Sequence, residues 1–403
     1  MTQGKMIGNV NVLDLRKATE ASVAEISRIG NVNVAIYSKE TAGLLPRLNI
    51  GNINVSVEVP SNVKAKTSIG RTVFNHAFVK EALDPVFEVA IGQVIVETDM
   101  TVEDIQKGFV GLVVIGQLVC PESLSGAIQT KAEQVIGETK TYPLMKQVKI
   151  GGMTLDASAL QGMEDKTEMA VIGNLTLPDV LPNDLLAQKI QKLFVLDGIK
   201  CREENAAVIQ AKLAPGSGGI SSIPAGFEWV NKSITLDNDL LETFTGKKLY
   251  CSERVVIDAS VTPAVLEEHL AAIIGEEIFC PLSLKSVFSH KCDLLKTQVV
   301  FYEGELWTVD DEENLTASRF DYLEGKATLL VTGVLKISPE VDPKVLAGRL
   351  AKIHNKGVIN CTPAQMGAVQ ARLGIHDGVI ADSTQQVEEE SPNAIGNANL
   401  LAL

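Results

Sequence analysis

The feature that most constrains this chain is a twelve-residue window that occurs five times and ends on Arg or Lys each time. The copies begin at Ile36, Cys120, Cys201, Cys280 and Cys361, so successive starts lie 84, 81, 79 and 81 residues apart. Units that recur at a fixed period stack on one another and bury a face that one unit cannot bury alone. The spacing therefore predicts a repeat architecture of five units, each of about 80 residues.

Residue types inside the window predict a strand, a turn and a short packed helix. Position seven is always Ala, Gly or Ser, as close helix packing requires, and position nine is always apolar. The residue two places before the window is also apolar in all five copies, so period two puts it on the same strand face as the first position. Four copies begin with Cys and one with Ile36, and we expect these first residues to be small, buried and apolar.

A second strand precedes each window. The signature Ile-Gly-x-hydrophobic-x-hydrophobic marks it at Ile7, Ile91 and Ile172. Alternation over five or six residues is typical of a strand with one buried face. A third, more variable coil is expected after the window, and in the fourth unit it includes residues 298–309. Each unit is thus predicted to contain three strand-then-helix coils.

The helices between these strands carry capping signals. Thr262 and Asp342 each precede a proline, which places a capping oxygen beside a residue whose missing N–H costs nothing. Thr101 with Asp104 predicts a capping box, and Asn183 is expected to cap the corresponding helix of the third unit. These signals predict short helices that alternate with the strands.

Strands joined by short helical crossovers predict a parallel sheet. Coils of about 20–29 residues are the size class of leucine-rich repeats. Gly-Asn-Val-Asn-Val begins at Gly8 and Gly30, and Gly-Asn-Ile-Asn-Val begins at Gly51, just over 20 residues apart. On these features residues 6–382 resemble a leucine-rich-repeat-like β/α solenoid. The family's Leu-x-x-Leu-x-Leu-x-x-Asn-x-Leu string is not repeated, so the resemblance implies architecture only and no ligand.

The expected fold class is therefore α/β, a repeat solenoid with a parallel sheet on one face and short helices on the other. We expect one domain of five units over residues 1–382. Residues 383–403 are predicted to be a polar, disordered tail, because the stretch to Asn393 shows no periodicity. The alternative is that the segment ending in Leu403 docks on an open edge, either its own or that of a neighbour.

Composition limits the classes of partner and compartment. The net charge is −14, from 36 basic and 50 acidic residues, which argues against a nucleic-acid or anionic-membrane surface. No apolar export segment follows Met1, and the six cysteines do not form a disulfide framework. A cytoplasmic protein with reduced thiols is expected. Its partner would be another protein or a second copy of the chain, with no nucleic acid and no membrane.

Two sets of side chains are candidates for a binding surface. Aromatic residues are only 4% of the chain, and recognition surfaces favour Trp and Tyr. The candidate partner surface consists of Phe227, Trp229, Tyr302, Trp307 and Tyr322, with ordinary packing as the alternative. The candidate basic row consists of the five bases that close the windows, Arg47, Lys131, Lys212, Lys291 and Arg372. It would bind an extended polyanion, or each base would interact with the C-terminal dipole of a helix and a nearby acid.

No catalytic, cofactor or metal site is predicted. Equivalent cysteines would lie too far apart to share a metal or a disulfide, and the acidic run from Asp310 to Glu313 lacks the alternating oxygen donors of a calcium loop. The expected function is that of a non-enzymatic repeat scaffold for protein–protein interaction or self-assembly. The alternative is a carbohydrate-active enzyme with paired carboxylates in a solenoid groove.

Overall fold

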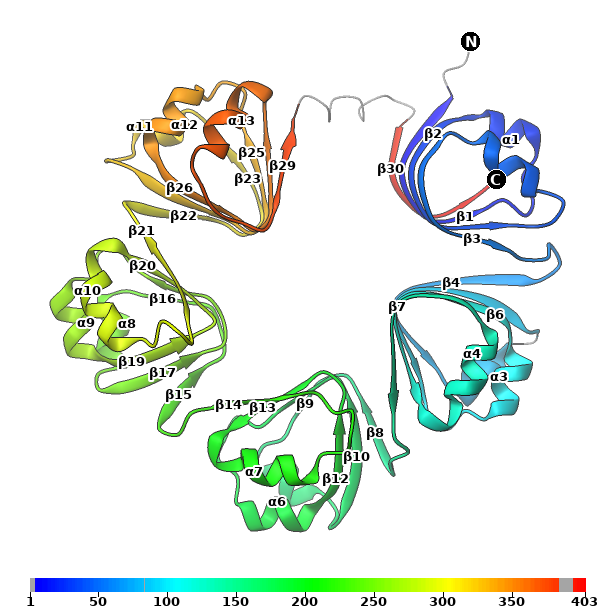
Figure 1. Ribbon diagram of the computed structural model, residues 1–403, viewed down its shortest axis with the longest axis horizontal. Coiled ribbons are helices and arrows are strands. Elements are labelled where there is room, and N and C mark those ends of the chain that lie inside the picture. Colours follow the sequence, from blue (N-terminus) through cyan, green and yellow to red (C-terminus); the bar gives the residue numbers. More distant parts are fainter. Residues whose placement is uncertain (1–3, 83, 384–393) are drawn as a thin grey trace. The chain divides into compact units, whose positions relative to one another are not determined.

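Small parallel sheets linked by short helices account for most of the described chain (Figure 1). The computed structural model describes residues 4–82, 84–383 and 394–403. The mixed α/β expectation is confirmed. The sheets group into five stacks, each four strands deep, with the third strand of each stack supplied by the repeated window. Two compact units contain the stacks, and they are described separately: one reaches Ser222 and also includes the last strand, and the other begins at Ile223.

Stack 1 combines residues 5–58 with residues 394–402. Apolar side chains alternate along its strands, so that Val10 and Val32 lie in the core between the sheet and the helices. The strands lie in the order β3-β2-β1-β30. The elements are β1 (Lys5–Asp14), α1 (Glu20–Ala24), β2 (Ile26–Tyr37), η1 (Ala42–Arg47), β3 (Ile50–Glu58) and β30 (Ala394–Ala402).

Stack 2 contains four long strands that bend at a shared glycine position. Gly70, Gly92, Gly116 and Gly137 pair in register, and each has a φ between 94° and 131°, a conformation that side chains other than glycine rarely adopt. The elements are β4 (Lys64–Phe74), α2 (His76–Glu81), β5 (Val86–Val96), α3 (Val102–Gly108), β6 (Phe109–Pro121), η2 (Glu122–Leu124), α4 (Ser125–Lys131) and β7 (Ala132–Tyr142).

In stack 3 most rungs, meaning the successive strand levels of a stack, are divided into two short strands. The stack therefore carries two narrow sheets, β12-β10-β8 and β14-β13-β11-β9. Its elements are β8 (Gln147–Ile150), β9 (Met153–Thr154), α5 (Ala157–Gly162), β10 (Thr167–Ile172), β11 (Asn174–Thr176), α6 (Asn183–Lys189), β12 (Ile190–Val195), β13 (Gly198–Arg202), α7 (Glu203–Lys212) and β14 (Ile220–Ile223).

Stack 4 has the same divided rungs in the second unit. Its sheets run β15-β17-β19 and β16-β18-β20-β21. Its elements are β15 (Phe227–Val230), β16 (Ile234–Leu236), α8 (Asn238–Thr243), β17 (Lys247–Cys251), β18 (Val255–Ile257), α9 (Pro263–His269), β19 (Leu270–Gly275), β20 (Glu277–Pro281), η3 (Leu282–Leu284), α10 (Lys285–Lys291) and β21 (Gln298–Tyr302).

Stack 5 completes the second unit with two four-stranded sheets, β22-β24-β26-β28 and β23-β25-β27-β29. Its elements are β22 (Glu305–Val309), β23 (Glu312–Leu315), α11 (Ser318–Asp321), β24 (Ala327–Val331), β25 (Val334–Ile337), α12 (Pro343–Arg349), β26 (Leu350–Asn355), β27 (Val358–Cys361), α13 (Pro363–Gln370), β28 (Leu373–His376) and β29 (Val379–Asp382).

The window behaves as its residue types predict. The four cysteines at its first position are fully or almost fully buried, and Ile36 occupies the equivalent place in stack 1. Position nine is buried at Ile128, Ile209, Phe288 and Val369. Burial raises the pKa of the thiols, for example that of Cys280 to about 12, so they act as small apolar groups.

Most of the predicted caps are present, with one error. Thr101 and Asp104 form a capping box at α3, and Thr262 and Asp342 accept hydrogen bonds at the starts of α9 and α12. Asn183 is not the cap of α6, because Pro182 precedes the first turn and Asn183 is already helical.

Two boundaries differ from expectation. Residues 298–309 do not form one coil, since β21 closes stack 4 and β22 opens stack 5. The tail prediction is wrong for residues 394–402, which form β30, while residues 384–393 lie outside the described part of the chain. No sheet among the described residues contains strands from two of the five stacks, so a single array over residues 1–382 stays a prediction. None of the helices in the described ranges is long and apolar enough to cross a bilayer.

Candidate interaction surface

The most specific long-range contact in the first unit joins β30 to β1. The two strands are parallel, with Met6 opposite residue 394 and Asp14 opposite Ala402 (Figure 1, red beside blue). The backbone N–H of Leu403 adds a 3.1 Å hydrogen bond to the carbonyl of Asp14. Residues 5–58 supply only three strands of this sheet, and β30 supplies the fourth.

Asparagine side chains continue the pairing across the sheet. The amide of Asn9 donates a 2.8 Å hydrogen bond to Asn397 and accepts one of 2.8 Å from Asn31. In a second column Asn11 donates to Asn399 at 3.0 Å and accepts from Asn33 at 2.8 Å. An amide both donates and accepts, so stacked asparagines satisfy one another from strand to strand. These columns fix the register of β30, because a shift by one residue would break both.

Glycines let the strands of stack 1 approach one another closely. A Cβ atom added at Gly8 would lie 2.2 Å from the carbonyl oxygen of Gly396, and one added at Gly30 would lie 2.3 Å from that of Gly8. A Cβ added at Gly396 itself would meet nothing within 4 Å. The added atom at Gly8 would therefore disturb the docking of β30 and leave the other neighbours of Gly8 in place.

Apolar side chains support β30 from inside the stack. Ala398, Leu401 and Leu403 are partly buried against the core that contains Val10 and Leu13. Burial of this kind contributes roughly 25 cal/mol for each Å² removed from water. The docked strand thus combines backbone pairing, amide columns and apolar packing.

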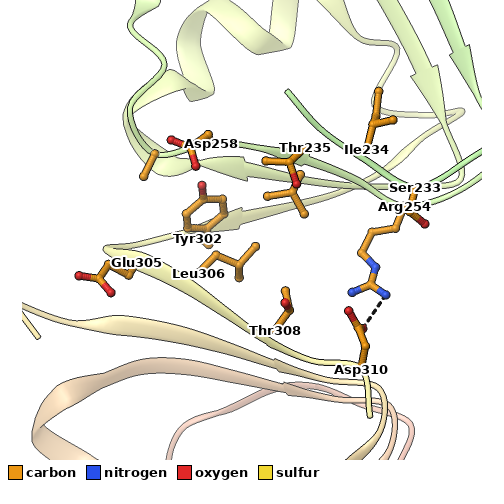
Figure 2. Close-up of a pocket in the computed structure, with 12 residues that line it drawn as sticks. Ser233, Ile234, Thr235, Arg254, Asp258, Tyr302, Glu305, Leu306, Thr308 and Asp310 are labelled. Atoms are coloured by element: carbon orange, nitrogen blue, oxygen red, sulfur yellow. Dashed lines mark hydrogen bonds and ion pairs between the residues drawn. The ribbon is translucent and has the colours of Figure 1, made fainter. Parts of the chain in front are cut away.

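The second unit contains a different feature, an open pocket of about 440 Å³ between stack 4 and stack 5 (Figure 2). Arg254 reaches across it to Asp310, with 2.7 Å between Nη2 and Oδ1. Asp258 and Tyr302 lie on the stack 4 side, and Glu305 stands on β22 (Figure 2). Three carboxylates around one opening are the arrangement in which acid–base chemistry would be sought.

Hydrogen bonds within the chain engage the polar groups of this pocket. Asp258 accepts from the backbone N–H of Ser260 at 2.8 Å, and Glu305 accepts from Trp307 Nε1 at 3.0 Å. Burial acts to raise the pKa of Asp310, but hydrogen bonds from Thr332 and Arg254 outweigh it and lower that pKa. An ionised Asp310 suits an ion pair and does not suit a general acid. The pocket walls are held together by the groups that line them.

The predicted aromatic surface does not form as one surface. Tyr302 is buried and donates a 2.6 Å hydrogen bond to the carbonyl of Ile257, as Tyr142 does to Val96 at 2.7 Å in stack 2. Trp307 is buried under Arg319, whose guanidinium lies 4.4 Å from the ring centre. The expectation is therefore wrong for Tyr302 and Trp307, whose rings belong to the packing.

The other three aromatic residues remain accessible to different degrees. Phe227 and Trp229 are half-buried on β15, and Trp229 Nε1 donates to Ser252 at 3.0 Å. Tyr322 is 90% exposed at the end of α11. A contact of these three with a partner stays a prediction.

The basic row has a structural role that the sequence pattern did not reveal. Lys131, Lys212 and Lys291 each donate to a carbonyl in the last turn of the preceding helix, at 3.0, 3.1 and 3.0 Å. Arg372 donates to Ala347 of α12 at 2.8 Å through Nε, and Arg47 pairs with Glu20, the first residue of α1. Cations at helix C-termini satisfy free carbonyls and the helix dipole. Four bases thus contact the C-terminal turn of the helix that precedes their own, as the helix-dipole interpretation expects, and the nearby acid that it also expects is present at Arg47.

A row spaced along one sheet is not formed by these bases. Each of the five lies in its own stack, and the sheets of the described residues end at every stack. The five bases therefore do not line up along one sheet, and binding of an extended polyanion stays a prediction.

Docking of the C-terminal segment on an open edge was only an alternative in the sequence-based prediction, which identified neither β30 as a strand nor β1 as its partner. The available signal was Ile395-Gly-Asn-Ala-Asn399, which repeats the Ile-Gly-Asn-x-Asn pattern that begins at Ile7, Ile29 and Ile50. Comparison with family models, curated proteins and solved structures finds no match to this chain, so its own residues carry the functional argument.

Proposed function

We propose that this chain is a non-enzymatic, solenoid-like repeat scaffold that mediates protein–protein interaction or self-assembly by adding strands to the edges of its parallel sheets. One observation carries the proposal: β30 recognises the edge of β1 across 388 positions of sequence through paired asparagines and a glycine contact. Strand addition gives affinity through the backbone and specificity through alternate side chains.

Unpaired sheet edges offer sites for this kind of recognition. The outer strands of each sheet have one edge without a partner strand among the described residues. In stack 2 these are β4 and β7, whose side chains are largely exposed or half-buried. Exposed edges bind further strands unless something covers or blocks them. A repeat that presents several such edges suits a scaffold.

The enzyme alternative has less support. A carbohydrate-active site needs a carboxylic acid whose pKa is raised so that it donates a proton, facing a second carboxylate. At the pocket of the second unit, the pKa of Asp310 is lowered, and Asp258 and Glu305 accept hydrogen bonds from the chain. These contacts favour a structural role for the three carboxylates.

The test measures binding of a labelled peptide with the sequence of residues 394–403 to the full chain. The chain carries Asn397→Pro and Asn399→Pro, which remove both amide pairs and two backbone N–H groups from its own β30. We expect saturable binding in fluorescence anisotropy, and at least a tenfold weaker signal when Gly8→Ala is added to the acceptor. Failure of the peptide to bind a chain whose circular dichroism is unchanged would overturn the proposal.

A further inference from the structure

We infer that β30 is exchanged between copies of this chain, so that residues 394–402 of one copy complete stack 1 of a second copy. The inference rests on the proposed function and names its partner. Stacks 2 to 5 each take their strands from one continuous stretch, 64–142, 147–223, 227–302 and 305–382. Stack 1 is different, because its fourth strand arrives from a distant part of the sequence.

The acceptor edge selects the strand that it binds. A docked strand must lay its backbone directly against Gly8, where a Cβ on Gly8 would lie 2.2 Å from the facing carbonyl oxygen, although a Cβ on Gly396 of the docked strand would meet nothing within 4 Å. It must also bring asparagine amides opposite Asn9 and Asn11. The chain contains Ile-Gly-Asn-x-Asn four times, and three copies already form β1, β2 and β3 of stack 1. The fourth copy, in β30, is the one available to a neighbour.

Charge does not oppose the exchange. Residues 394–402 contain no Asp, Glu, Lys or Arg, so two copies meet at this edge without like charges in the donated strand. Proteins commonly place charges on edge strands to prevent such pairing. The absence of that protection in β30 separates this contact from an ordinary surface edge.

Exchange makes the same contacts whether the strand comes from the same copy or another one. The backbone ladder, the amide pairs and the packing of Leu401 and Leu403 are chemically identical in the two cases. Whether the strand binds its own chain or another copy then depends on how the protein concentration compares with the effective concentration of the tethered strand. Donor strand and acceptor edge are different surfaces, so reciprocal exchange closes a dimer and one-way exchange extends a chain of copies.

The test uses two full-length variants that complement each other. One carries Gly8→Ala, which blocks its acceptor edge and leaves its β30 intact. The other carries Asn397→Pro and Asn399→Pro, which disables its β30 and leaves its acceptor edge open. Light scattering after size-exclusion chromatography gives the mass of each alone and of the equimolar mixture. We expect each alone to have the mass of one chain, and the mixture to contain a species of twice that mass.

Matched controls assign the result to the strand. In the first control the donor variant carries Gly396→Ala in place of Gly8→Ala. This substitution introduces no clash at the contact, so the variant binds its own β30 and still offers that strand to the proline variant on mixing. Adding Gly8→Ala to the proline variant removes the acceptor, and the heavier species should disappear. If the mixture stays monomeric while the labelled peptide still binds the proline variant, exchange is overturned and the proposed function stands. If the mixture stays monomeric and the labelled peptide does not bind the proline variant, the exchange and the proposed function are both overturned.

Discussion

Asn9 and Asn397 share a 2.8 Å side-chain hydrogen bond although 388 positions separate them in the sequence. The bond marks the register in which β30 joins β1, and it repeats the bond between Asn31 and Asn9 one strand further in. A distant segment therefore supplies the same chemistry as a neighbouring rung of the stack. Stack 1 thus contains three strands that follow one another in the sequence and a fourth strand, β30, that pairs specifically with β1 from a distant part of the sequence.

Removal of a window-closing base should destabilise the stack that contains it. Arg372→Met deletes the donation to the carbonyl of Ala347, so we expect the free energy of unfolding of the second unit to fall by about 1 kcal/mol. Both tryptophans, Trp229 and Trp307, lie in this unit, so urea unfolding followed by tryptophan fluorescence reports it. The exposed Lys344→Met on α12 is the control and should change little. Equal losses in the two variants would contradict the carbonyl-capping role.

A buried amide at window position five should matter more. Asn205 is fully buried, accepts from the N–H of Leu181 at 2.9 Å and donates to its carbonyl at 2.7 Å. Asn205→Ala leaves both backbone groups without these partners, which should cost roughly 2 kcal/mol or more. Urea unfolding followed by circular dichroism measures the loss, with the exposed Gln210→Ala on the same helix as control. A loss no larger than that of Gln210→Ala would show that water replaces the amide.

Glu88 should make the first unit less stable as pH rises. Its carboxyl is buried in stack 2, and burial raises its pKa to about 7 even though Ser68 donates a 2.5 Å hydrogen bond to it. Between pH 4.5 and about 7 the unfolded chain loses a proton that the folded chain keeps, so the free energy of unfolding falls, by up to about 3 kcal/mol. Glu88→Gln should remove this slope in urea unfolding, whereas Glu133→Gln on the exposed face of β7 should keep it.

His354 should give the second unit the opposite response. Its Nδ1 accepts a 3.2 Å hydrogen bond from the N–H of Ile375, and burial, more than any nearby charge, lowers its pKa. As pH falls below about 6.5, the imidazole is protonated in the unfolded chain but stays neutral in the folded chain. The free energy of unfolding therefore decreases as the pH falls. His354→Asn should flatten the tryptophan-detected decrease, and the exposed His376→Asn should not. An unchanged slope in His354→Asn would contradict the assignment.

Local patterns in the sequence were sufficient to predict the buried positions and the helix caps within each stack. The buried cysteines, the small seventh and apolar ninth window residues and the caps at Thr101, Thr262 and Asp342 follow from periodicity and capping chemistry, which act within a few residues. The partner of Lys212 did not follow, because its distance to Ala187 depends on how two helices are offset between rungs. Docking of the C-terminal segment was open as an alternative, but its pairing with β1 did not follow from the sequence, because no short-range rule selects a strand 388 positions away.

Cysteine pairing across the joined strands tests the central claim that β30 completes stack 1. Asn9 and Asn397 lie opposite each other, and a disulfide requires Cα atoms within about 7 Å. A chain with Asn9→Cys and Asn397→Cys is oxidised mildly and compared with one carrying Asn9→Cys and Ala402→Cys, which are five positions out of register. The native thiols should not compete, because burial raises the pKa of all six.

Mass spectrometry of the oxidised proteins identifies the crosslinked peptides, and non-reducing electrophoresis shows whether they join one chain or two. We predict rapid crosslinking of the in-register pair and little crosslinking of the mismatched pair. The fraction of crosslinks that join two chains should rise with protein concentration. Crosslinking of the in-register pair that is no faster than that of the mismatched pair would contradict the account.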